Sequence, residues 1–134
     1  MGSKGLLSEH SFKPVGEGWY PILEALEATL AGILKSSAHP DEFQIDCIKE
    51  KFGRLHVYWS GWGLEEEVLY RITGAIDLVQ QLSVRICEAC GSAEGTENRK
   101  ATAGVGAVRT LTLCAKCHKI RDETGTLTFG GHTV

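Results

Sequence analysis

Two short segments decide how the last third of this 134-residue chain folds: Cys87-Glu88-Ala89-Cys90 and Cys114-Ala115-Lys116-Cys117. Two residues between paired cysteines let the backbone turn so that both sulfurs face one point, and Gly91 can adopt the positive φ that such turns often need. Four thiolates match the tetrahedral preference of zinc, so the sequence predicts one structural Zn²⁺ bound by all four cysteines. Such a site is coordinatively closed, and its metal is expected to hold structure and not to activate water.

Other interpretations of these residues remain open. The four thiols could be free and simply pack, or one pair could be a redox C-x-x-C motif, although two pairs without a thioredoxin-like βαβ pattern favour a metal. His118 follows Cys117 directly and could replace it as a ligand, but the adjacent side chain is expected to point elsewhere. The gap from Cys90 to Cys114 is longer than the usual ribbon spacing. Strand-like alternation over residues 108–113 predicts a hairpin that accommodates it.

Upstream of the first cysteine pair, the spacing of apolar residues predicts a helix, a β-hairpin and a second helix. Apolar residues recur at helical spacing over 21–36 and 64–82. Residues 43–48 and 55–59 alternate like strands around the turn residues 51–53. The predicted fold class is therefore α+β: a helix–β-hairpin–helix scaffold with a C-terminal four-cysteine zinc ribbon. Residues predicted to be buried together are Leu26, Leu30, Val57, Trp59, Ile72, Ile76 and Val79, with Cys47 as a small core residue.

These patterns divide the chain into four parts. Residues 1–18 are predicted to be a mobile N-terminal arm, 19–82 the helix–hairpin–helix domain, 83–122 the zinc ribbon and 123–134 a C-terminal tail. The net charge of −3 gives no overall attraction to nucleic acid. Residues 83–122, however, carry seven Lys/Arg against four Asp/Glu, so the ribbon is mildly basic.

The sequence also indicates a compartment. The cysteine usage favours a reducing environment, and neither a secretory signal nor an apolar run of about 18 residues is seen. We therefore expect a cytoplasmic protein with no membrane contact.

Candidate partner-binding residues surround the predicted hairpin. Tyr58 and Trp62 belong to an aromatic cluster that either forms a binding surface or packs through Trp59 and leaves its neighbours exposed. Basic residues near the turn form either a solvated rim or a partner contact; these are Lys49, Lys51 and Arg54.

The chain resembles a small uncharacterised family of bacterial and phage proteins. The resemblance rests on Trp19-Tyr20, the hairpin sequence from Ile45 to Leu55, the segment Arg85-Ile86-Cys87-Glu88-Ala89-Cys90-Gly91 and Arg109-Thr110-Leu111. It covers roughly residues 19–120 and implies a K-E-K-F-G-type hairpin followed by a helix and a zinc ribbon. The chain departs from the family at Arg54, where a second glycine is often found, and in its C-terminal tail. The resemblance implies a bacterial or phage origin and carries no assigned chemistry.

A second, local resemblance involves Leu113-Cys114-Ala115-Lys116-Cys117-His118-Lys119, which looks like the last zinc knuckle of HNH endonucleases. In those enzymes the histidine after the last cysteine helps to bind a catalytic metal, and another histidine between the knuckles activates water. Residues 91–113 contain no histidine. His118 is thus expected at a helix start, at the surface beside the knuckle, or as a local hydrogen-bond donor to a backbone carbonyl.

The sequence therefore favours a non-enzymatic, zinc-stabilised interaction protein that binds a host protein, for example as a phage inhibitor of a host defence complex. The alternative is a nucleic-acid-binding protein that uses the basic ribbon, including a catalytically inactive HNH relic. The oligomeric state and the identity of the partner do not follow from the residues.

Overall fold

The structure is a computed structural model that describes residues 6–12, 14–101 and 109–134. Within them helices and small antiparallel sheets alternate, so the predicted α+β class is confirmed. The elements are α1 (Glu9–Phe12), η1 (Glu17–Trp19), α2 (Tyr20–Leu34), η2 (Pro40–Glu42), β1 (Gln44–Lys51), β2 (Arg54–Ser60), α3 (Glu66–Ser83), β3 (Glu97–Ala101), β4 (Arg109–Leu113), α4 (Ala115–Thr124), β5 (Thr128–Phe129) and β6 (His132–Thr133).

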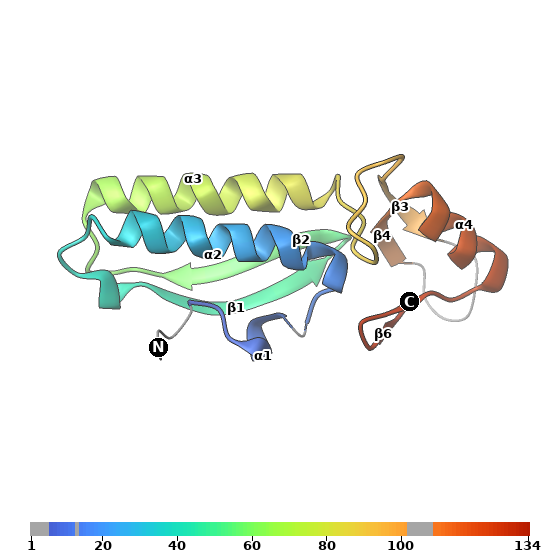
Figure 1. Cartoon of the computed structure of the whole chain (residues 1–134), viewed down its shortest axis with the longest axis horizontal. Coiled ribbons are helices and arrows are strands. Elements are labelled where there is room, and N and C mark those ends of the chain that lie inside the picture. Colours follow the sequence, from blue (N-terminus) through green and yellow to red (C-terminus); the bar gives the residue numbers. More distant parts are fainter. Residues whose placement is uncertain (1–5, 13, 102–108) are drawn as a thin grey trace.

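Helices α2 and α3 lie side by side in opposite directions above the β1–β2 hairpin, and together these four elements form the helix–hairpin scaffold (Figure 1). Strands β3 to β6 and helix α4 gather beyond the hairpin turn. We call this part, residues 87–101 and 109–134, the cysteine module. Each part has its own cluster of buried apolar residues.

The scaffold core contains the residues that helical and strand periodicity predicted. Leu26, Leu30, Ile72 and Ile76 are all buried from the two helices. Val57 and Val79 are buried with them, and Trp59 is partly buried against the same cluster. Because apolar side chains one helical turn apart share a face, each helix presents one continuous stripe to the hairpin.

The register of the hairpin differs from the predicted alternation. Ile45 pairs with Trp59 and Cys47 pairs with Tyr58, so a β-bulge places one extra residue in β1. The bulge reverses the faces beyond it, and Ile48, 1% exposed, enters the core. Cys47 is only half-buried, so its prediction as a core residue is wrong.

The outer edge of β2 is protected by side chains from α3. Leu55 N donates to Ser83 Oγ at 3.0 Å, and Val57 N donates to Gln80 Oε1 at 2.8 Å. A strand edge with unpaired N–H groups is prone to pair with other chains. Here the side chains of Ser83 and Gln80 accept hydrogen bonds from those N–H groups within the molecule.

The predicted mobile arm is wrong for the part of residues 1–18 that the structure describes. Leu7 and Val15 are buried in the scaffold core, and Leu7 N donates to Glu27 Oε2 on α2 at 2.7 Å. Apolar burial and this hydrogen bond hold the segment against the scaffold. The prediction for residues 1–5 lies outside the described residues.

The C-terminal segment is also more structured than predicted. Strands β5 and β6 pair as a short hairpin, and Phe129 is buried in the apolar cluster of the cysteine module. The tail therefore adds a buried aromatic side chain to the cysteine module, whose other elements supply few apolar residues. Across the described ranges, none of the helices is long and apolar enough to cross a membrane.

Candidate metal centre

The four predicted cysteine ligands come together in the cysteine module. One ligand atom from each of Cys87, Cys90, Cys114 and Cys117 lies within 4.8 Å of the others. Cys90 Sγ and Cys114 Sγ are 3.6 Å apart. Sulfurs placed about 2.3 Å from a tetrahedral zinc lie about 3.8 Å from one another. The group could hold one metal ion, and its donor set and spacing fit a closed tetrahedral site.

The protonation of the thiols bears on metal binding. Burial raises the pKa of Cys87 and of Cys117, so both thiols favour the protonated form in the absence of a positive charge. A metal ion stabilises the thiolate form directly. A bound metal ion would therefore release protons here and hold the four sulfurs together.

Two local structures aim the sulfurs at one point. Gly91, with φ 82°, closes the first knuckle by donating its N–H to Cys87 O at 2.8 Å. The second pair begins a helix, since Cys114 is the N-cap of α4 and Cys117 lies in its first turn. The positive end of the helix dipole favours a thiolate at this position. A helix start was only one option given for His118, and the extent of α4, which ends where Gly125 adopts φ 83°, was not predicted.

The first knuckle is anchored to the start of α2. Trp19 is fully buried, and its Nε1 donates to Ser83 O at 3.1 Å and to Ile86 O at 2.8 Å. Gly18 N donates to Glu88 O at 3.0 Å. A Cβ added at Gly18 would lie 2.1 Å from Cys87 O, so only glycine permits this approach. The metal ligands are thus positioned by the scaffold as well as by their own turns.

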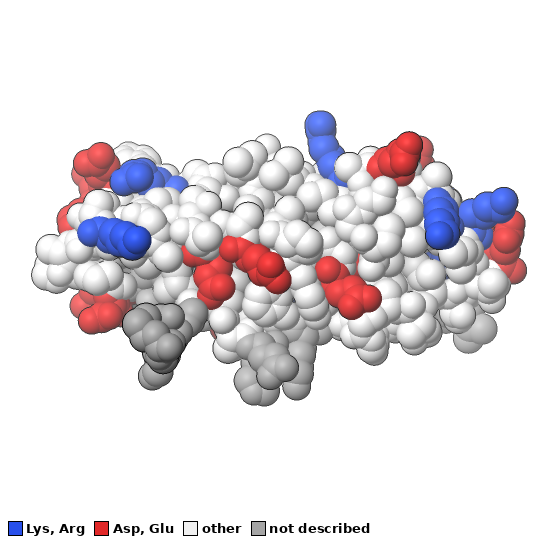
Figure 2. Space-filling view, in the orientation of Figure 1, with Lys and Arg blue, Asp and Glu red and all other residues white. Residues whose placement is uncertain are grey.

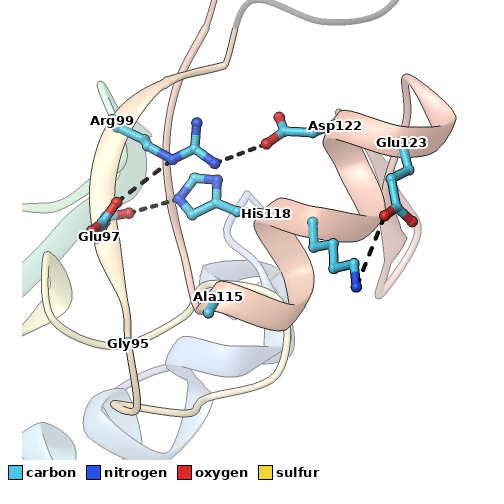
Figure 3. Close-up of a pocket in the computed structure, with 8 residues that line it drawn as sticks. Gly95, Glu97, Arg99, Ala115, His118, Asp122 and Glu123 are labelled. Carbon is cyan, nitrogen blue, oxygen red and sulfur yellow. Dashed lines mark hydrogen bonds and ion pairs between the residues drawn. The ribbon is translucent and has the colours of Figure 1, made fainter.

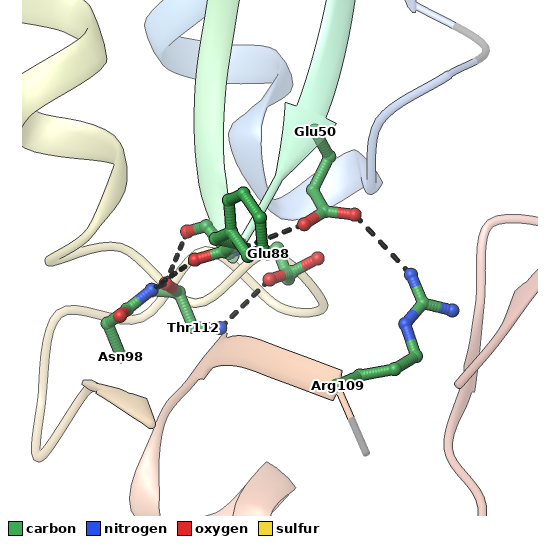
Figure 4. Close-up of polar contacts among 7 residues, drawn as sticks. Glu50, Glu88, Asn98, Arg109 and Thr112 are labelled. Atoms are coloured by element: carbon green, nitrogen blue, oxygen red, sulfur yellow. Dashed lines mark hydrogen bonds and ion pairs between the residues drawn. The ribbon is translucent and has the colours of Figure 1, made fainter. Parts of the chain in front are cut away.

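The hairpin turn and the cysteine module share a second junction, shown in Figure 4. Thr112 Oγ1 donates to Gly53 O, and Asn98 Nδ2 donates to Phe52 O at 2.9 Å. Thr112 N donates to Glu88 Oε2 at 2.9 Å. Burial raises the pKa of Glu88 to about 7. Sequence reasoning assigned no role to Asn98, Thr112 or Glu88, because their partners are distant in the chain.

His118 is a structural residue in this geometry. It is 3% exposed, and its Nε2 donates to Glu97 O at 2.9 Å, which joins α4 to β3 (Figure 3). The predicted helix start is confirmed, since His118 lies in the first turn of α4. The hydrogen bond to a backbone carbonyl is present, but it is not local as predicted, because Glu97 lies 21 residues away. A surface position is wrong. A pocket of about 390 Å³ lies beside the ring. Its charged groups pair with one another, Asp122 with Arg99 at 2.9 Å and Glu123 with Lys119 at 4.0 Å.

The predicted partner-binding residues lie along the hairpin but differ in exposure. Trp62 is 95% exposed beyond the end of β2, and Tyr58 is 40% exposed. Lys49 and Lys51 are exposed, and Lys51 Nζ donates to Tyr58 Oη at 3.0 Å. Arg54 is half-buried, and its Nε donates to Gln80 O at 3.4 Å, so it contacts α3 and does not face a partner freely.

Sequence reasoning missed two exposed aromatic residues, Tyr70 on α3 and Phe52 at the tip of the hairpin. A signal was present for Phe52, because two-residue hairpin turns strongly prefer Asn, Asp or Gly at its position.

Charged side chains on the face shown in Figure 2 lie mainly toward the two ends and along one side of α2, and the surface over the middle of α2 and α3 is largely uncharged.

Comparisons with models of protein families, with curated proteins and with solved structures find no match to this chain.

Proposed function

We propose that the four-cysteine group binds one zinc ion and that the ion is structural. Zinc is the metal that closed sites of four thiolates ordinarily hold. With four protein ligands, no coordination position is open for water or substrate. The ion would therefore supply folding energy to the cysteine module and take no part in a reaction.

We further propose that the chain is a non-enzymatic interaction protein that binds a protein partner through its hairpin. The observation that carries this proposal is Trp62, whose side chain is 95% exposed although tryptophan is among the largest apolar residues. Exposed tryptophan and tyrosine side chains are the commonest hot spots of protein interfaces. Tyr58 and its hydrogen-bond partner Lys51 extend the surface along the hairpin.

The nature of the partner follows from the sequence resemblance alone. A phage protein acting in the bacterial cytoplasm would bind a host protein, for example a component of a defence complex. The reducing chemistry expected for four metal-bound thiolates is consistent with that compartment.

A capture experiment tests the interaction. The zinc-loaded, tagged chain is incubated with bacterial lysate, and retained proteins are identified by mass spectrometry. We expect a specific protein that Trp62→Ala fails to retain. Leu78→Ala is the matched control, because Leu78 is an exposed apolar residue on α3. Equal retention by the Trp62 variant, or no specific protein at all, would contradict the proposal.

The second candidate is a nucleic-acid-binding protein derived from an HNH endonuclease. The surroundings of His118 argue against nuclease activity. His118 uses its Nε2 to bind Glu97 O, and neighbouring carboxylates pair with Arg99 and Lys119. A hydrolytic centre needs a metal-bound water and a free base. We expect no cleavage of single- or double-stranded DNA or RNA with magnesium, manganese or nickel. Metal-dependent cleavage that is lost in His118→Ala would support the nuclease candidate.

A further inference from the structure

The conformation of Phe52 stands out from the rest of the described chain. Among the residues that the structure describes, it is the only non-glycine with positive φ, at 56°. A bulky residue in this region is strained, and such strain persists only where the surroundings enforce it. The ring is also 79% exposed. The turn thus holds an aromatic ring in solvent despite both backbone strain and apolar exposure.

Four hydrogen bonds fix this turn. Asn98 Nδ2 and Thr112 Oγ1 donate to the carbonyls of Phe52 and Gly53 from the cysteine module. Asn98 Nδ2 also donates to Thr112 Oγ1 at 2.8 Å. Gly53 N donates to Glu50 Oε2 at 2.7 Å from the scaffold side. The aromatic ring is therefore presented by a backbone held from both parts of the molecule, and little ordering is needed when it binds a ligand.

A groove of about 720 Å³ surrounds the ring, with a lining of mixed charge and predominantly positive sign. Among the described residues that line the groove, Glu50 carries the only carboxylate. It accepts a hydrogen bond from Gly53 N and forms an ion pair with Arg109 at 3.4 Å. The lining residues are Glu50, Lys51, Phe52, Lys100, Arg109 and Thr110. Three cationic side chains thus line the groove that holds one exposed aromatic ring; Arg109 also pairs with Glu50, and Lys51 Nζ also donates to Tyr58 Oη.

We propose that this groove binds single-stranded nucleic acid, with one base stacked on Phe52 and the adjacent phosphates contacted by Lys51, Lys100 and Arg109. Every base has a π face that stacks on an aromatic side chain, and cations that flank the ring neutralise the backbone. The groove has the size of a small-molecule or nucleotide site. The net charge of −3 provides no long-range attraction, so binding depends on this local constellation and is strongly weakened by salt.

This site is distinct from Trp62, which carries the proposed protein interaction and lies beyond the other end of β2, although Lys51 borders both surfaces. Binding is measured by fluorescence anisotropy, with the zinc-loaded full chain and labelled oligothymidylate or oligouridylate of about 12 nucleotides. The two oligonucleotides distinguish DNA from RNA as the ligand, and saturable binding of either supports the site. We expect the logarithm of the binding constant to fall linearly with the logarithm of salt concentration.

Variants separate stacking from charge. Phe52→Leu removes the π face but keeps an apolar side chain, and should weaken binding about 10-fold, whereas Phe52→Tyr should bind like the parent. Lys100→Gln, an exposed position, should reduce the salt slope by about one. Trp62→Ala should leave binding unchanged, which separates this site from the protein interaction.

Three results would overturn the proposal. The first is the absence of saturable binding at low salt, and the second is equal binding by Phe52→Leu and the parent chain. The third is tighter binding of a glutamate-rich peptide than of either oligonucleotide, which would assign the groove to an acidic protein segment.

Discussion

At the residue scale, buried polar contacts decide how the cysteine module meets the scaffold. Thr112 is fully buried and bonds to both Gly53 and Asn98 across the junction. Thr112→Val keeps the shape of the side chain but removes these contacts and leaves polar groups unsatisfied. We expect a loss of about 1–3 kcal/mol in the free energy of unfolding, measured in urea with zinc present. Thr128→Val, at an exposed position, is the control, and an equal effect of both substitutions would contradict this role.

Glu65 is a residue whose charge state links pH to stability. Its carboxylate accepts from Ser37 Oγ at 2.6 Å and from Ala38 N at 2.9 Å, and these bonds lower its pKa from 4.5 to about 2. Because the folded-state pKa is below the unfolded one, its stabilising contribution is complete above pH 4.5 and is lost as pH falls toward 2. Glu65→Gln should flatten the stability profile in that window, measured by urea unfolding, whereas Glu66→Gln should not. Parallel profiles for the parent and the Glu65 variant would exclude this linkage.

At the element scale, helix α3 organises the scaffold. It packs on α2, covers β2, and satisfies the edge of that strand through Gln80 and Ser83. Ile76 lies at the centre of its buried face. Replacing Ile76 by alanine should lower the free energy of unfolding by about 2–5 kcal/mol. Leu78→Ala on the exposed face should change the free energy little in the same denaturation experiment. Comparable losses for the two variants would mean that the outer face is also buried in solution.

At the scale of the whole molecule, two apolar clusters of unequal size divide the chain. The cluster in the cysteine module depends on Leu111, Leu113 and Phe129 beside the ligands, and is too small to fold well alone. Removal of metal by a chelator, or by Cys90→Ser, should therefore disorder the module while α2, α3 and the hairpin largely persist. Two-dimensional NMR and elemental analysis measure this outcome.

Cys47→Ser is the matched control for metal loss, because Cys47 lies in β1 and outside the four-cysteine group. It should retain one zinc per chain. Protein that is purified without chelator and contains no zinc would refute the zinc assignment, even if the fold persisted.

Features that rest on short-range periodicity could be predicted from the residues alone. Cysteine spacing identified the four residues that gather in the metal centre, and apolar spacing located α2, α3 and the core side chains, because both signals repeat within a few residues. The two-residue turn was also visible, since Gly53 favours positive φ.

Features that depend on partners distant in the chain became visible only in the folded molecule. The bulge after Ile45 arises from pairing with Trp59 and Tyr58, and no local pattern in β1 indicates it. The burial of Val15 and Phe129 requires surfaces supplied by other elements, so local patterns in the two terminal segments do not reveal it. The strained Phe52 turn is held by Asn98 and Thr112, and hydrogen bonds between residues far apart in the chain leave no periodic trace in the sequence.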